Sequence, residues 1–169
     1  MTTFAEAFAR QAASDLEAFE YLSRSNLPAC HRLHYLQMWL EKLCKAYIWL
    51  TDDMEDLRWT HNVVAKVLPL MIREHWRRIG FSQPPNLSEI REICREIDLL
   101  HPQVDDGGRR PDNVEYPWKD GRGNVFFPAA PPRPFSVLQR LEKSPTGRKL
   151  RKAAIVLTRE RPIHVKGLH

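Results

Sequence analysis

The chain has 169 residues, of which 43% are hydrophobic and 28% are charged, and its formal net charge is +5. This composition is typical of a globular domain and excludes a largely disordered chain, and the length allows a core without disulfides or metal. The sequence contains no apolar run of about 18 residues and no signal-peptide pattern at its start. Its three cysteines form no Cys-x-x-Cys pair. We therefore expect a cytoplasmic protein with reduced thiols and no membrane association.

Charge is distributed unevenly along the chain. The net charge is −4 over residues 1–57, +2 over residues 58–101 and +7 over residues 102–169. A positive C-terminal third can attract phosphate-rich or acidic partners. The alternative interpretation is a solvated basic end with no partner.

Helical periodicity dominates the first 101 residues. Apolar residues recur at steps of three and four in four segments, and breaks rich in Pro, Gly, Asn or Asp separate them. We expect Thr60 to cap the third helix and Asn86 to cap the fourth. The proline at position 69 predicts a kink in the third helix. The expected helices span residues 3–24, 28–50, 61–79 and 87–100.

The second of these segments carries the broadest apolar face. Leu36, Leu40, Leu43 and Tyr47 follow one another at helical spacing, and Trp39 and other apolar residues widen the stripe. So wide a face predicts a central helix contacted on more than one side. We expect these four side chains to be buried.

Residues 102–134 change in character. They are rich in Pro and Gly but also contain aromatic residues, which predicts a long ordered loop with a short hairpin near Asp120. Residues 135–160 predict a basic C-terminal helix broken near Pro145, followed by a frayed end. We expect one domain overall, made of a helical bundle (1–101), a long loop (102–134) and a basic helix with its tail (135–169).

Part of this pattern resembles a known family. The run LQMWLEKLCKAY (36–47) is similar to the "EKxxKAxL" helix of HEPN domains, the higher eukaryotes and prokaryotes nucleotide-binding family. Thr60-His61 resembles the entry to the next helix in that family, and VEYPW (114–118) resembles an aromatic-proline element that follows its bundle. The resemblance covers residues 1–118, and less clearly 135–157.

The resemblance implies an all-α, up-and-down bundle of four to five helices that is often dimeric. Many HEPN proteins are metal-independent ribonucleases that use an Arg followed four to six residues later by a His. Others lack that motif and serve as binding or antitoxin-linked modules, and members recur in toxin–antitoxin, CRISPR and anti-phage defence systems.

One segment matches the spacing of that ribonuclease motif. Arg95 precedes His101 with five residues between them. In this chemistry His101 would move a proton to or from a ribose or leaving-group oxygen, and Arg95 would stabilise phosphate charge. Glu96, next to Arg95, would repel a phosphate. The alternative is a surface arginine and a helix-end histidine with structural roles.

Other chemistry-bearing residues favour structural roles. We expect His61 to bond within its own helix start or to a facing helix. Cys30, His31 and His34 lie close in sequence, but no second Cys/His pair completes a metal site, so we expect no metal and no cofactor. The aromatic residues fall at helical spacing and predict core or dimer-interface positions.

The strongest candidates for nucleic-acid contact lie in the C-terminal helix. They are basic residues that fall near one face: Arg148, Lys149, Arg151 and Lys152. Together with what the resemblance to HEPN domains implies, these residues lead us to expect an RNA- or partner-binding module of a prokaryotic defence or toxin–antitoxin-like system, forming a homodimer or hetero-complex. The alternatives are an endoribonuclease using Arg95 and His101, and a structural subunit of a larger complex.

Overall fold

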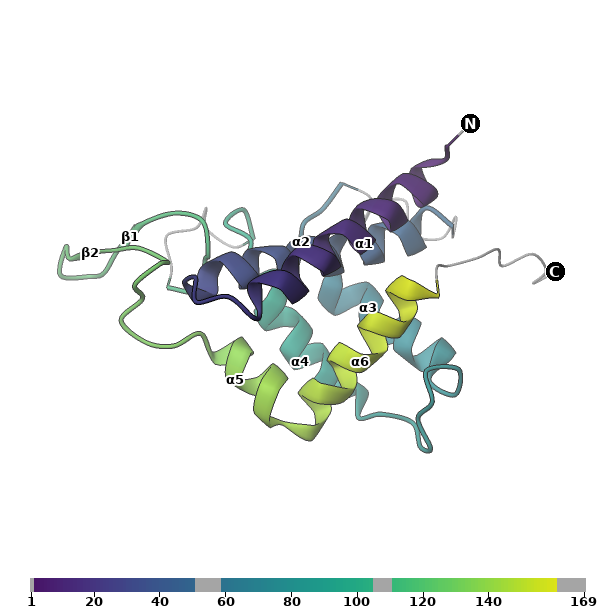
Figure 1. Ribbon diagram of the computed structural model, residues 1–169. Coiled ribbons are helices and arrows are strands. Elements are labelled where there is room, and N and C mark those ends of the chain that lie inside the picture. Colours follow the sequence, from purple (N-terminus) through teal and green to yellow (C-terminus); the bar gives the residue numbers. More distant parts are fainter. Residues whose placement is uncertain (1, 51–58, 105–110, 161–169) are drawn as a thin grey trace.

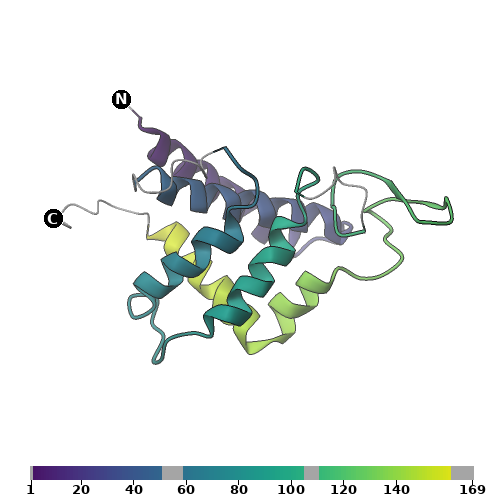
Figure 2. The ribbon, with the colours of Figure 1, turned by 180° about the vertical axis from the view of Figure 1, so that it is seen from behind.

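The computed structural model describes residues 2–50, 59–104 and 111–160. Within these ranges the protein is all-α apart from one short two-stranded sheet (Figure 1). Helices come in three consecutive pairs, and α6 of the last pair crosses in front of α3 and α4 in Figure 1 and behind them in Figure 2. No described helix is both long enough and apolar enough to cross a membrane.

The first pair is formed by α1 (Phe4–Leu22) and α2 (Ala29–Ile48). Thr3 caps α1 because its hydroxyl accepts the N–H of Glu6 while the Glu6 carboxylate accepts the N–H of Thr3. A short loop returns the chain antiparallel along α1. The half-buried Lys42 donates to Asp15 at 2.6 Å and so ties the two helices together.

Helix α2 is the centre of the core, as its apolar pattern predicts. Leu36, Leu40 and Leu43 are buried, which confirms the expectation for these three residues. Tyr47 is only partly buried, and its hydroxyl bonds to Glu74 instead. Trp39 is fully buried and donates to the hydroxyl of Thr158 at 2.7 Å.

The second pair is formed by α3 (Val64–His75) and α4 (Leu87–Asp98). Asn86 caps α4 by accepting the N–H groups of Ser88 and Glu89, as predicted. The predicted cap at Thr60 was wrong. Val63 holds the cap position of α3, and its side chain makes no capping bond. The first N–H groups of α3 donate instead to the carboxylate of Asp98, which belongs to α4.

A hairpin and a third helix pair complete the described chain. Strands β1 (Trp118–Lys119) and β2 (Val125–Phe126) pair antiparallel about a turn that begins at Asp120, where the hairpin was expected. Ser144 then divides the expected last helix into α5 (Ser136–Lys143) and α6 (Pro145–Arg159). This break, which the sequence predicts near Pro145, gives six described helices, whereas a bundle of four to five was expected. The expected frayed end at 161–169 lies outside the described residues.

Candidate functional site

A buried carboxylate lies at the middle of α2. Glu41 has a side chain only 8% exposed, and it is held by two residues of its own helix. Gln37 donates to its Oε2 at 2.7 Å and Lys45 donates to its Oε1 at 2.7 Å. These partners lie four residues before and after Glu41, which is the spacing that places side chains on one helix face.

The charge of Glu41 is maintained in spite of its burial. Desolvation by burial raises the pKa of this carboxyl, but the hydrogen bond and positive charge of Lys45, with the hydrogen bond from Gln37, bring the pKa below its ordinary value. Glu41 is therefore a carboxylate at neutral pH, fixed in orientation at both of its oxygens.

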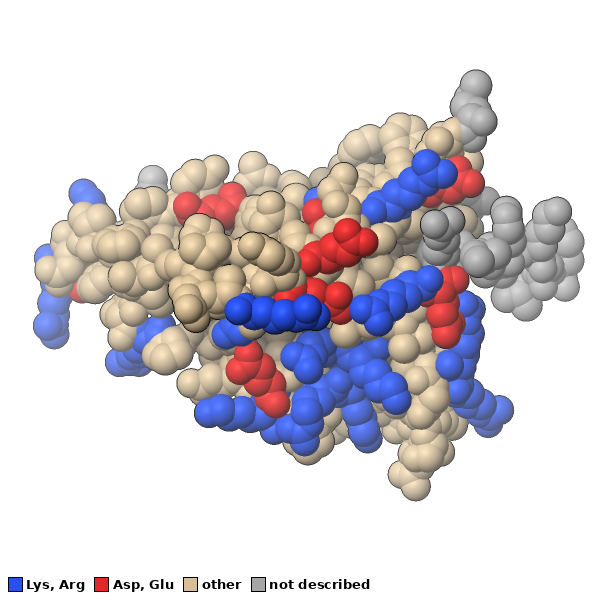
Figure 3. Space-filling model, in the orientation of Figure 1, with Lys and Arg blue, Asp and Glu red and all other residues tan. Residues whose placement is uncertain are grey.

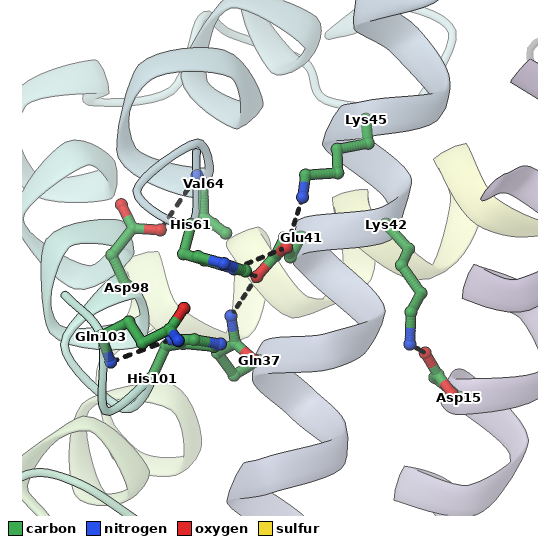
Figure 4. Close-up of polar contacts among 10 residues, drawn as sticks. All are labelled: Asp15, Gln37, Glu41, Lys42, Lys45, His61, Val64, Asp98, His101 and Gln103. Carbon is green, nitrogen blue, oxygen red and sulfur yellow. Dashed lines mark hydrogen bonds and ion pairs between the residues drawn. The ribbon is translucent and has the colours of Figure 1, made fainter. Parts of the chain in front are cut away.

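His61 reaches this carboxylate from the segment before α3. Its Nδ1 lies 3.2 Å from Oε1 and 3.4 Å from Oε2 of Glu41 (Figure 4). Of the two bonds that the sequence predicts for His61, within its own helix start or to a facing helix, the structure shows the second. A carboxylate that accepts from Nδ1 fixes the ring and leaves a lone pair on Nε2 in the neutral imidazole.

His101, just after the end of α4, completes the cluster. Its ring stacks on that of His61 with centroids 4.0 Å apart and planes 11° apart. Its Nδ1 accepts the backbone N–H of Gln103 at 3.2 Å. Burial, followed by the charge of His61, lowers the pKa of His101, so this imidazole is neutral at neutral pH.

Asp98 fixes the two histidine-bearing segments relative to one another. It lies in the last turn of α4, three residues before His101, and its two carboxylate oxygens accept the N–H groups of Val64 and Ala65 at 3.0 Å. The start of α3, three residues after His61, is thereby held at the end of α4 (Figure 4). Burial raises the pKa of Asp98 to about 7.

The cluster that results consists of Glu41, His61 and His101. Each residue offers one ligand-type atom, and these atoms all lie within 4.8 Å of one another. Two partly buried imidazoles beside a buried carboxylate are able to exchange protons with a bound substrate or to coordinate a metal ion.

Of the predicted catalytic pair, the structure brings only His101 into this cluster. Arg95 is exposed on α4, and within the described residues its side chain makes no hydrogen bond or ion pair. Its neighbour Glu96, which was expected to repel phosphate, instead bonds to Arg140 and accepts from the hydroxyl of Ser136 at 3.0 Å. The pairing of Arg95 with His101 stays a prediction.

The predicted basic residues all lie exposed on α6. Arg148 donates to the backbone oxygens of Glu142 and Lys143 at the end of α5. Among the described residues, no carboxylate pairs with Lys149, Arg151 or Lys152. Lys and Arg side chains gather over the lower part of the face that carries α6 (Figure 3). We call Arg148, Lys149, Arg151 and Lys152 the basic face.

Helix α6, which carries the basic face, lies on the far side of α2 from the cluster. In the close-up of the cluster, α6 passes behind α2 (Figure 4). A ligand bound along the exposed side of α6 therefore does not have to contact His61 or His101.

Sequence reasoning did not find the cluster. Glu41 and His61 are 20 positions apart, and His101 follows 40 positions later, so no local spacing joins them. The sequence therefore offers no local signal that groups these three residues. Comparison with family models, curated proteins and solved structures finds no match to this chain.

Proposed function

We propose that this protein is an RNA-binding, HEPN-like up-and-down helical module of a prokaryotic defence or toxin–antitoxin-like system. The observation that carries the RNA-binding part is the basic face of α6. All four of its cations are exposed and have no carboxylate partner among the described residues, and Arg148 alone makes a side-chain hydrogen bond there, to backbone oxygens. Cations of this kind neutralise phosphates, release counterions and so provide affinity that does not depend on sequence.

The fold supports this use of α6. Its inner side is anchored by Leu150, Ala154 and Leu157, which are buried in the core. The basic side chains therefore project from a helix that is already folded against the core. RNA binding does not have to pay the free-energy cost of ordering this helix.

The test is RNA binding by a variant in which Arg148, Arg151 and Lys152 are all changed to Glu. We expect wild-type affinity to fall steeply with salt and the variant to lose binding. A matched control changes Arg24, Lys66 and Arg122 to Glu, because these residues are also exposed and form no ion pair among the described residues. If the α6 variant and the control variant bind RNA with equal affinity, the proposal is contradicted.

A second candidate function is metal-independent cleavage of RNA, and the cluster is the observation that favours it. A neutral His101 has the protonation state of a general base at neutral pH, and its Nδ1 lone pair becomes available when the ring gives up the N–H of Gln103. In the proposed step it removes the proton of a ribose 2′-hydroxyl, the 2′-oxygen attacks phosphorus, and the bond to the 5′-oxygen breaks. The products are a 2′,3′-cyclic phosphate and a 5′-hydroxyl, and the leaving oxygen receives a proton. Arg95 would carry the phosphate charge.

RNA cleavage in the presence of EDTA tests this candidate. His101→Ala should reduce the rate by roughly 100-fold or more, in line with the contribution of a positioned acid or base. Arg95→Ala measures whether the predicted pair acts together. His75→Ala is the control, because His75 lies in the last turn of α3 and outside the cluster. Equal rates in the His101 and His75 variants would exclude His101 from catalysis.

A further inference from the structure

The cluster also has the donor set of a metal centre. Two imidazoles and one carboxylate are the protein ligands that zinc uses in sites that keep a fourth position open. Glu41, His61 and His101 supply these groups from three separate elements, with ligand atoms within 4.8 Å of one another. We propose that they bind one divalent transition-metal ion, of which Zn²⁺ is the best match. This inference does not rest on RNA binding, and it is an alternative to metal-independent cleavage at the same residues, because a ring nitrogen bound to a metal ion cannot act as a base.

Two of the three ligand positions already have the required spacing. Two atoms bound to one tetrahedral Zn²⁺ at about 2.0–2.1 Å lie roughly 3.4 Å apart. The Nδ1 of His61 lies 3.2 and 3.4 Å from the two oxygens of Glu41. An ion at this position replaces the proton that the two groups otherwise share.

His101 must move to complete the site. Its ring lies nearly parallel to that of His61, with centroids 4.0 Å apart, so the in-plane lone pairs of the two rings do not converge on one ion. The ring follows the end of α4 and is only partly buried. Rotation of this side chain gives up the stack on His61 and the bond from Gln103 and brings a ring nitrogen toward the ion.

The carboxylate keeps capacity for a metal ion beside its present partners. Each carboxylate oxygen has two acceptor sites, and Lys45 and Gln37 each use one site on a different oxygen. Partners of this kind orient a ligating carboxylate. Because Lys45 also brings a positive charge close to the site, we expect binding in the micromolar range rather than tighter.

The experiment is equilibrium dialysis of the full, tag-free chain against Zn²⁺, with the absorption spectrum of Co²⁺ as a second measurement. We expect one ion per chain and a Co²⁺ spectrum typical of tetrahedral coordination. His61→Ala and His101→Ala should each weaken binding by roughly 10-fold or more. Two controls should leave binding unchanged: His34→Ala, whose ring pairs with Glu115, and the double variant His164→Ala/His169→Ala.

The absence of a bound ion in wild type, or binding that both cluster variants retain, would overturn the proposal. If a variant fails to fold, histidine NMR signals of the wild-type protein decide the matter. Zn²⁺ should shift the signals of His61 and His101 and leave those of His34 and His75 in place, and the opposite pattern refutes the site. Because RNA binding is tested by changes on α6, failure there leaves this result unaffected.

Discussion

The carboxylate of Asp98 accepts the backbone N–H of Val64, 34 positions earlier in the chain, at 3.0 Å. Its other oxygen accepts the N–H of Ala65. One side chain at the end of α4 thus satisfies two of the N–H groups that the start of α3 leaves without helical partners. The bond holds together the two segments that carry His61 and His101.

This bond leads to a prediction about pH. Burial raises the pKa of Asp98 to about 7, from an ordinary value of 3.8. Between these values the folded protein holds a proton that the unfolded chain has released, so the contribution of Asp98 to stability falls as pH rises from about 4 to 7. The total fall is up to about 4 kcal/mol.

Urea unfolding of wild type and Asp98→Asn across this pH range measures the effect. The difference between the two proteins isolates Asp98, because other titrating groups contribute equally to both. The amide introduced by Asp98→Asn does not titrate, so the advantage of wild type should shrink with rising pH. A difference that is independent of pH would show that the pKa of Asp98 is not raised.

The central position of α2 predicts a large cost for truncating Leu40. This side chain is 2% exposed within the core, and its loss leaves a cavity. Leu40→Ala should lower the free energy of unfolding by about 2–5 kcal/mol. Urea melts measure this value, with Leu27→Ala as an exposed control. A loss below about 1 kcal/mol would mean that Leu40 is not part of a packed core.

The joint between α5 and α6 has no room for a side chain at position 147. A Cβ added to Gly147 would lie 2.1 Å from the backbone oxygen of Arg140 and 2.7 Å from the Cα of Leu141. Gly147→Ala should therefore lower the free energy of unfolding by about 1–3 kcal/mol, which is the usual cost of overpacking. Gly121→Ala is the matched control, because nothing lies within 4 Å of its added Cβ. Thermal melts in which both variants match wild type would refute the close approach.

Exposed aromatic rings lead to a prediction of self-association. Phe4 stacks on Trp49 with centroids 4.6 Å apart, and Trp59 meets Trp49 edge-on. Phe4 is 61% exposed and Trp59 is 77% exposed, so apolar surface remains in contact with water. The sequence predicts core or dimer-interface positions for the aromatic residues. Because Trp59 is exposed and so lies outside the core, we expect it at an interface.

Light scattering at high micromolar concentration should give the mass of a dimer, or of a hetero-complex once the partner is added. Trp59→Lys should return the mass to that of a monomer. Tyr21→Lys is the control, since Tyr21 is also exposed but makes none of these ring contacts. A monomeric wild-type protein that binds no partner would contradict the prediction.

Local sequence signals predicted most of the helices. Asn86 was identified as a cap because its bonds reach only two and three residues along the chain. The leucines of α2 were identified as core because one helical face was apolar over its whole length. Both features depend on neighbours in sequence, which is the information that periodicity and capping patterns use.

Features that depend on distant residues were not predictable in this way. Thr60 was a reasonable cap by residue type, but the carboxylate of Asp98 takes that role from another helix. The cluster of Glu41, His61 and His101 likewise exists only because α2, α3 and α4 pack together. His101 was selected for its spacing from Arg95, whereas the structure places it against His61.

The hydrogen bond from Trp39 to Thr158 joins residues 119 positions apart. The indole therefore obtains its partner only after α6 has been synthesised, and until then one side of α2 has no cover from that helix. A nascent chain in this condition exposes apolar surface, which attracts chaperones or other unfinished chains. Docking of the last described helix is thus the step that gives the buried indole N–H its partner.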